Sequence, residues 1–207
     1  MVGSLVFGFW SVSMLLALTP GVDWAYAIAS GLRPRRAFPA VAGLLSGHLI
    51  AAIVVAAGVA AVIAGSDTAM TVLTLAGACY LVRLGISAVR DPAAPDLDGQ
   101  AAPTGRLRLA AKGVGVSLLN PKVFLLFLAL LPQFTRPDAG WPVGFQMLVL
   151  GVLHVLNCAV VYFAVGYGAS TVLTKHPRGA QVVSLLSGIV MIVLGIVLAA
   201  ERFLPLF

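Results

Sequence analysis

Charged residues are scarce in this sequence. Asp, Glu, Lys and Arg make up 10% of its 207 residues, whereas a soluble domain has about 25%. Hydrophobic residues make up 60%, and the mean hydropathy is +1.05. This composition excludes an ordinary soluble domain and predicts an all-α integral membrane protein, since helices satisfy their own backbone hydrogen bonds in lipid.

Cysteine is nearly absent: Cys79 and Cys158 both lie in apolar segments, with no C-x-x-C pair. This excludes a disulfide framework and a paired-cysteine zinc site. We expect both residues to pack as small hydrophobic side chains. Acidic residues and histidines inside the apolar segments are also few, so we expect no metal site and no cofactor. No nucleophile and base pair is visible, which argues against an enzyme.

The net charge of +6 does not indicate nucleic-acid binding, because the basic residues stand in short loops between apolar runs. Six such runs are each long enough to cross about 30 Å of hydrocarbon. The sequence therefore predicts six transmembrane helices. The runs cover residues 4–30, 37–64, 68–89, 110–131, 143–173 and 182–200.

The loop charges predict the orientation of the helices. The second and fourth loops offer a single basic residue, Arg136. Cytoplasmic loops carry the excess of Lys and Arg, so the odd-numbered loops should be cytoplasmic and both termini should lie outside. The basic residues of the odd-numbered loops and their flanks are Arg33, Arg35, Arg36, Arg90, Arg106, Arg108, Lys112, Lys175 and Arg178.

A stretch rich in Pro, Asp and Gly after residue 90 predicts a flexible linker. We expect a first three-helix repeat over residues 1–90, a cytoplasmic linker over 91–109 and a second three-helix repeat over 110–207. Because three is odd, the second block enters the membrane in the opposite orientation. The pattern is typical of a transporter built from two inverted repeats, with the first helix of each repeat broken at a proline.

The two proline breaks are Thr19-Pro20-Gly21-Val22-Asp23 and Asn120-Pro121-Lys122. Thr and Asn are favoured N-cap residues and Pro is favoured at the first position of a helix. Each break should therefore end one half-helix and begin another. The prolines should leave the carbonyls of Leu16 and Ser117 without their usual partners.

The breaks predict a binding site for a zwitterion. A lysine at the centre of a membrane helix costs about 2.5–3.5 kcal/mol on insertion scales and is tolerated where it lines a cavity. Helix N-termini and Lys122 suit a carboxylate, while free carbonyls and Asp23 suit an ammonium. We expect Asp23 and Lys122 to pair when the site is empty.

Asp23 is also a candidate proton carrier, since burial favours the neutral form of a carboxyl group. The candidate substrate-binding residues are Thr19, Pro20, Gly21, Asp23, Asn120, Pro121, Lys122 and Asn157.

Other polar residues give weaker signals. Asn157 lies three residues after His154, on one face of the fifth predicted helix, and His48 lies in the second. With Ser46 they either line a pathway or bond to neighbouring helices. Glycines at packing spacing, such as Gly43 and Gly47, indicate close helix packing within one subunit or, alternatively, a homo-oligomer interface.

The motifs resemble the lysine-exporter (LysE/RhtB-type) family of amino-acid efflux proteins. The resemblance covers nearly the whole chain, and its most specific part is the run LLNPKVFLLFLALLPQF. The first motif departs from the family pattern, which usually has a second proline where Val22 stands. Membership implies outward transport of amino acids or close derivatives across a bacterial inner membrane, powered by an ion gradient such as that of protons.

Two alternatives remain open at this point. One is a transporter of another small solute or a metal ion on a similar fold, although metal export would need more intramembrane acids, His or Cys. The other is a non-transporting membrane subunit, for which the two charged breaks have no explanation. Which amino acid is carried depends on pocket shape, where one methylene is worth only about 1–3 kcal/mol.

Overall fold

The computed structural model describes residues 3–31, 34–63, 67–90, 105–168 and 177–203. These residues form helices and short turns and contain no strand. The helices, in chain order, are α1 (Gly3–Leu18), α2 (Val22–Gly31), α3 (Pro34–Ile63), α4 (Asp67–Arg90), α5 (Arg106–Leu118), α6 (Pro121–Leu130), the 3-10 turn η1 (Pro132–Phe134), α7 (Val143–Gly168) and α8 (Pro177–Phe203).

Two of these helices are long and apolar enough to cross a membrane on their own. They are the stretches Arg36–Gly58 of α3 and Val143–Gly168 of α7. The pairs α1 with α2 and α5 with α6 also qualify if each pair counts as one span, although each is bent by 60°. The described residues thus contain two to four candidate spans, while α4 and α8 contain shorter apolar stretches, Thr74–Ser87 and Gly188–Val197.

The first apolar run is interrupted between Leu18 and Val22, but the hydrogen bonds at this interruption differ from the predicted ones. Thr19 does not cap α2: its hydroxyl donates backward to the Leu15 carbonyl (3.1 Å). The Thr19 N–H donates to the Leu16 carbonyl (3.2 Å). The prediction of a free Leu16 carbonyl was therefore wrong, because an i to i+3 bond replaces the lost helical one.

At the second interruption, the Asn120 side chain accepts a hydrogen bond from the Lys122 N–H (3.0 Å), and Pro121 is the first residue of α6. Asn120 is therefore the predicted N-cap. The Ser117 carbonyl is not free, however, because it accepts from the Asn120 N–H (3.2 Å). At both interruptions the carbonyl that loses its usual partner to a proline is therefore satisfied locally.

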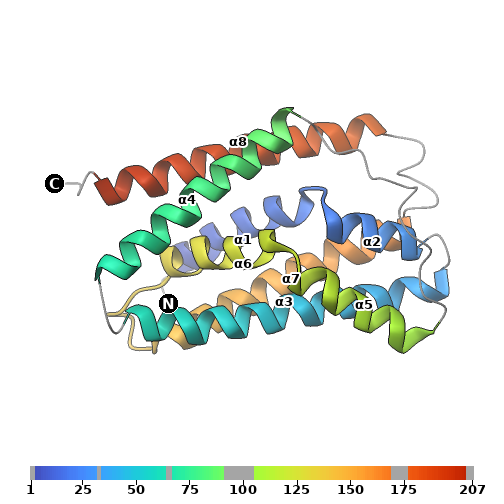
Figure 1. Cartoon of the computed structure of the whole chain (residues 1–207), viewed down its shortest axis with the longest axis horizontal. Helices are drawn as coiled ribbons and strands as arrows, with labels where there is room; N and C mark the ends of the chain where they lie inside the picture. Colours follow the sequence, from blue (N-terminus) through green and yellow to red (C-terminus); the bar gives the residue numbers. More distant parts are fainter. Residues whose placement is uncertain (1–2, 32–33, 64–66, 91–104, 169–176, 204–207) are drawn as a thin grey trace.

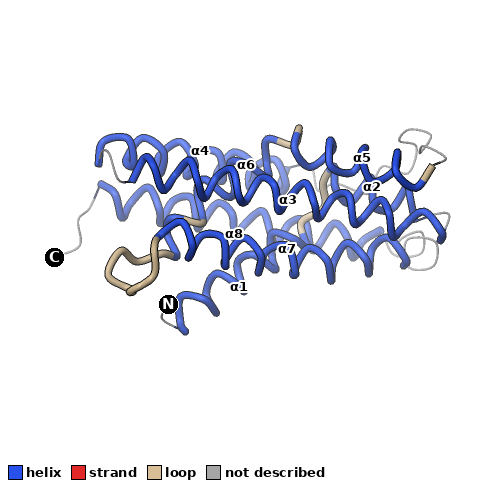
Figure 2. Tube along the Cα trace, turned by 90° about the horizontal axis from the view of Figure 1, so that it is seen from below, coloured by secondary structure: helices blue, strands red, loops and turns tan. Residues whose placement is uncertain are grey.

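The helices run along one long axis (Figure 1). α4 packs against α8 along one side of the molecule, and α3 packs against α5 and α7 along the other. α1 and α6 lie between these layers in Figure 1, with α1 in contact with α7 and α8, and α6 in contact with α3 and α4. Figure 2 shows the same elongated arrangement from below. One helix of each broken pair, α1 or α6, is therefore central to the bundle.

Glycines allow these helices to approach closely. A Cβ on Gly43 of α3 would collide with the backbone carbonyl of Ala110 in α5, and one on Gly85 of α4 would lie 2.5 Å from the carbonyl oxygen of Gly188 in α8. The predicted role of Gly43 in packing within one subunit is confirmed, and Gly85 has the same role.

Parts of the predicted loops lie outside the described residues. This holds for Arg33, Lys175 and most of the predicted linker, residues 91–104. Its remaining part is helical from Arg106, where α5 begins, so the second block of helices starts a few residues before the predicted boundary at 110.

Candidate functional site

A small cavity lies where the two interruptions meet in the core. Thr19, Gly21 and Asp23 line it from the first interruption, and Asn120 and Lys122 line it from the second. Its volume is about 20 Å³, which holds about one water molecule. The cavity is therefore too small for an amino acid. Among the other described residues that line the cavity are Leu16, Trp24, His48, Leu126, His154 and Tyr162.

Asp23, in the first turn of α2, is the central acid of this cavity and is only 6% exposed. Its Oδ2 accepts hydrogen bonds from Asn120 Nδ2 and from the Tyr162 hydroxyl, each at 3.3 Å. The Ser117 hydroxyl makes a longer contact with Oδ1 (3.5 Å). A buried carboxylate needs such partners. Asn120, at the interruption between α5 and α6, therefore directly stabilises Asp23, which follows the first interruption.

The ionic partner of Asp23 differs from the prediction. His48 Nε2 of α3 lies 3.8 Å from Asp23 Oδ2, a distance that makes an ion pair when the imidazole is protonated. Among the described residues, no ion pair forms between Asp23 and Lys122, so the predicted pairing was wrong. The physical reason is that polar groups of α3, α5 and α7 already surround the carboxylate.

Lys122 is half-buried and lines the same cavity from the first turn of α6. Its Nζ lies 3.8 Å from the position that a Cβ on Gly21 would take. Gly21 therefore gives the ammonium room beside the first interruption, a role beyond the flexibility that the sequence indicated. The two opposite charges share one cavity without touching each other.

Asn120 connects the two interruptions. Its Oδ1 caps the Lys122 N–H, while its Nδ2 donates to Asp23. One side chain therefore fixes the start of α6 and orients the acid of α2. The neighbouring Ser117 hydroxyl lies 3.0 Å from the Leu44 carbonyl and 3.1 Å from His48 Nδ1.

A second polar network lies beside the cavity. Asn157 does not line the cavity; its Nδ2 donates to the Ser13 hydroxyl (3.0 Å) and to the Trp10 carbonyl (3.2 Å). The Ser13 hydroxyl also bonds His154 Nδ1 (2.8 Å). Asn157 thus holds the residues behind the cavity. Pro20 likewise is not among the described lining residues.

Several residues of the site escaped the sequence reasoning. Tyr162 and Ser117 contact Asp23, and Trp24 Nε1 donates to the Ala17 carbonyl (2.9 Å), which ties α2 to the last turn of α1. Tyr162 lies eight residues after His154 on one helix face, a spacing that was a readable signal. Ser46, in contrast, bonds the Ala42 carbonyl on an exposed surface, away from the cavity.

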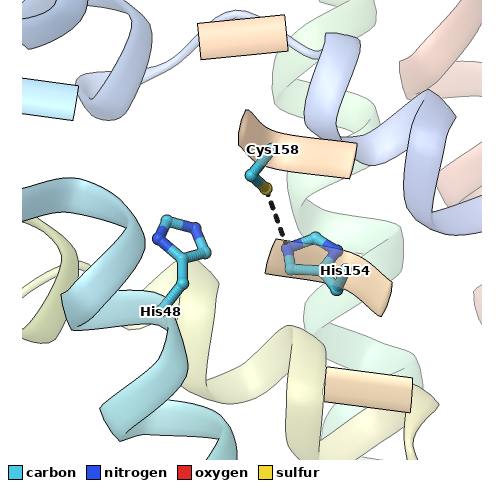
Figure 3. Close-up of side chains that lie close together, drawn as sticks. All are labelled: His48, His154 and Cys158. Carbon is cyan, nitrogen blue, oxygen red and sulfur yellow. Dashed lines mark hydrogen bonds between the residues drawn. The ribbon is translucent and has the colours of Figure 1, made fainter. Parts of the chain in front are cut away.

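Cys158 is buried but does not merely pack as a hydrophobic side chain. Its Sγ lies 3.3 Å from His154 Nε2. His48 of α3 approaches the same place, and the three side chains point toward one another (Figure 3). The other cysteine, Cys79, is exposed.

Apolar helices interrupted around a small polar cavity with an acid and a lysine are typical of a membrane transporter. The comparisons with known proteins agree with this class. The family described as "LysE type translocator" matches residues 14–202. The chain belongs to this family, as the motifs indicated.

Two of the relatives have names that describe efflux proteins. The chain is 31% identical to the homoserine/homoserine lactone efflux protein of Salmonella typhimurium, over 95% of this chain and 96% of the relative. It is 26% identical to the leucine efflux protein of Klebsiella pneumoniae, over 76% of each chain. It is 35% identical, over 76% of each chain, to an uncharacterized membrane protein of Vibrio cholerae. No solved structure matches significantly.

The family membership and the apolar helices identify a multi-pass membrane transporter. They also indicate a transporter rather than an enzyme, in agreement with the sequence reasoning.

Proposed function

We propose that this protein is a secondary active transporter that exports amino acids or close derivatives across the bacterial inner membrane, with proton coupling. The observation that carries the proposal is that Asp23 and Lys122 line one buried cavity between two interrupted helices. The substrates in the relatives' names, homoserine, homoserine lactone and leucine, support it. Homoserine and leucine carry an ammonium and a carboxylate, and the lactone is a close derivative that keeps the amino group.

In this proposal the substrate's ammonium binds Asp23 and its carboxylate binds Lys122. The Tyr162 hydroxyl and Asn120 Nδ2 keep the carboxyl oxygens of Asp23 oriented. The absence of an ion pair between Asp23 and Lys122 supports this arrangement, since a zwitterion that binds between two charges need not first separate them. Thr19 and Gly21 complete the binding site from the first interruption. Pro20 and Pro121 interrupt the two helices. Asn157 holds the residues behind the cavity in place.

The proposed architecture is six transmembrane helices in two inverted repeats, residues 1–90 and 110–207, joined by the linker 91–109. The order of elements supports it, because each block has a broken pair followed by two helices. Part of the packing supports it too: α4 packs on its counterpart α8, and α3 packs on α5 as its counterpart α7 packs on α1, which a pseudo-two-fold axis would produce. The contact of α4 with α6 is not matched to the same extent by α8 and α2.

The cavity is smaller than an amino acid, so transport requires the site to open. The two 60° bends lie directly beside the cavity. Residues at helix ends and in short breaks are where hinges absorb backbone rotation. We therefore propose that the first interruption, Thr19 to Gly21, and the second, at Asn120, act as hinges that open the cavity alternately to the two sides.

Asp23 is the proposed proton carrier. The carboxylate is buried, and its protonation removes the charge that holds both the substrate ammonium and His48. A proton that enters from outside would thus release the amino acid to the outside, and release of that proton to the cytoplasm would leave Asp23 charged for the next amino acid.

The test is a radiolabelled efflux screen over the amino acids with the purified chain in proteoliposomes. Asp23→Asn keeps the size of the side chain and removes its charge. We expect amino-acid transport driven by a pH gradient to fall about tenfold or more. The reason is that the loss of one charge-assisted contact in a buried site costs more than about 1.4 kcal/mol of binding free energy. Lys122→Ala should weaken amino-acid binding to a similar extent.

Asp138→Asn is the matched control, since Asp138 is exposed and far from the cavity residues in the chain. Its transport should equal that of the unmodified protein. Full gradient-driven transport by Asp23→Asn would contradict the role of Asp23 in proton coupling, and transport of no amino acid by the unmodified chain would contradict the function itself.

A further inference from the structure

Three metal-ligating side chains meet in the core beside the cavity. One ligand atom from each of His48, His154 and Cys158 lies within 4.8 Å of the corresponding atoms of the other two, and all three residues are buried. The imidazole rings of the two histidines stack with their centroids 5.6 Å apart. Figure 3 shows that His48 approaches from α3, while His154 and Cys158 approach from α7. Transport of an amino acid, as proposed above, assigns no role to His154 or Cys158.

Hydrogen bonds orient the His48 ring so that one nitrogen is available. Its Nδ1 lies 3.0 Å from the Leu44 carbonyl and 3.1 Å from the Ser117 hydroxyl. These contacts hold the ring so that its other nitrogen, Nε2, faces Asp23 Oδ2 at 3.8 Å.

His154 and Cys158 are oriented in the same manner. His154 Nδ1 bonds the Ser13 hydroxyl (2.8 Å), and its Nε2 faces Cys158 Sγ (3.3 Å). An imidazole with one nitrogen held by a carbonyl or hydroxyl and the other directed at a shared centre is the usual arrangement around zinc. The two histidines therefore have both a ligand atom and the outer support that fixes it.

The distances fit a small tetrahedral ion. Zinc bonds of about 2.0–2.3 Å place its ligand atoms roughly 3.3–3.8 Å from one another. The pair His154 Nε2 and Cys158 Sγ at 3.3 Å and the pair His48 Nε2 and Asp23 Oδ2 at 3.8 Å both meet this spacing. The ligand atoms of His48, His154 and Cys158 lie within 4.8 Å of one another, so they need shifts of about an ångström toward the centre. The Asp23 carboxylate is placed only by its distance to His48 and would have to move in from there.

We propose that His48 Nε2, His154 Nε2, Cys158 Sγ and the Asp23 carboxylate form a binding site for a divalent ion of the zinc class, one that prefers imidazole and thiolate ligands. On binding, the Cys158 thiol loses its proton to solvent and the sulfur becomes a thiolate ligand, while both histidines bind as neutral rings. One proton leaves for each ion that binds, and no electron is transferred.

The site overlaps the proposed amino-acid site at Asp23. A carboxylate engaged with a metal ion is not available to a substrate ammonium, so the bound ion should block efflux. This consequence rests on the proposed function, whereas metal binding itself does not.

The binding test uses the purified full chain, prepared with a tag that lacks histidine and treated with a chelator, then titrated with Co²⁺ and afterwards with Zn²⁺. We expect one Co²⁺ per chain, a thiolate-to-cobalt charge-transfer band in the near-ultraviolet spectrum, and displacement of Co²⁺ by Zn²⁺. Cys158→Ser should abolish the band. Cys79→Ser is the matched control and should keep it, because Cys79 is the exposed cysteine.

His48→Gln provides a second variant in case Cys158→Ser does not fold; it should weaken Co²⁺ binding at least tenfold. Absence of saturable Co²⁺ binding would overturn the proposal. A band that persists in Cys158→Ser or disappears in Cys79→Ser would overturn it as well.

Proteoliposomes then separate this inference from the proposed function. Zn²⁺ should inhibit amino-acid efflux by the unmodified chain and by Cys79→Ser, and Cys158→Ser should need about tenfold more Zn²⁺ for the same fractional inhibition. Efflux that is insensitive to Zn²⁺ in a chain that binds Co²⁺ would overturn the blocking role. Stoichiometric Co²⁺ binding without transport of any amino acid would support the metal site and contradict the proposed function.

Discussion

Asp23 receives its contacts from several separate parts of the chain. His48 belongs to α3, Ser117 to α5, Asn120 to the second interruption and Tyr162 to α7. A change in the charge of this one carboxyl group therefore alters contacts to most of the inner helices at once. At the scale of single residues, this is the physical basis for coupling occupancy of the site to helix movement.

Tyr162→Phe tests that coupling. The substitution removes the hydroxyl that donates to Asp23 (3.3 Å) and keeps the ring that packs edge-on against His48. A hydrogen bond to a charged group contributes about 1.5–3 kcal/mol, so we expect kcat/KM for efflux to fall about tenfold. Tyr167→Phe on the same helix is the control, because Tyr167 is 50% exposed. Equal rates for the two variants would contradict the role of Tyr162.

At the scale of the elements, α3 matters because one of its faces accepts α5 at very short range. Cβ atoms at Gly43 and Gly47 would meet Ala110 and Ser117 of α5. This close approach also brings Ser117 within hydrogen-bond distance of His48 and Leu44. The glycines thus position polar groups of the site as well as packing the bundle.

Gly43→Ala should therefore destabilise the protein. The added methyl would collide with the Ala110 carbonyl, and overpacking typically costs about 1–3 kcal/mol. The measurement is thermal unfolding in detergent. Gly58→Ala is the control, since nothing lies within 4 Å of a Cβ there; it should leave Tm unchanged or slightly raised. If both variants unfolded at the same temperature, close packing of α3 on α5 would not be what Gly43 provides.

At the scale of the whole molecule, the orientation in the membrane follows from the loop charges, and this part of the proposal needs its own test. Asp138 precedes α7, and Arg106 begins α5; both are exposed. If the odd-numbered loops are cytoplasmic, these two positions lie on opposite sides of the membrane.

Single cysteines at these positions, introduced in a Cys79→Ser background, distinguish the two sides in intact cells. Asp138→Cys should react with a membrane-impermeant thiol reagent, and Arg106→Cys should react only after the cells are permeabilised. The buried Cys158 should stay unlabelled in both. The opposite labelling pattern would invert the proposed topology and place both termini in the cytoplasm.

The sequence by itself determined the features that depend on neighbouring residues. Apolar runs predicted the helices closely, since burial in lipid requires continuous helical hydrogen bonding. The chain is interrupted at Pro20, where the proline N–H is missing, and Asn120 caps α6 as its type and place predicted. The quoted motifs were also sufficient to indicate the family.

The tertiary structure alone decided which side chains meet. The sequence predicted that Asp23 pairs with Lys122, yet the partners of Asp23 include Ser117 and Tyr162, which stand 94 and 139 positions away in the chain. Similarly, His48 meets His154 and Cys158 only because α3 packs on α7. The periodicity of a helix tells which face a side chain occupies. Which other helix that face meets is set by the packing of whole helices, to which glycines and the shape of the helix surfaces contribute more than charge.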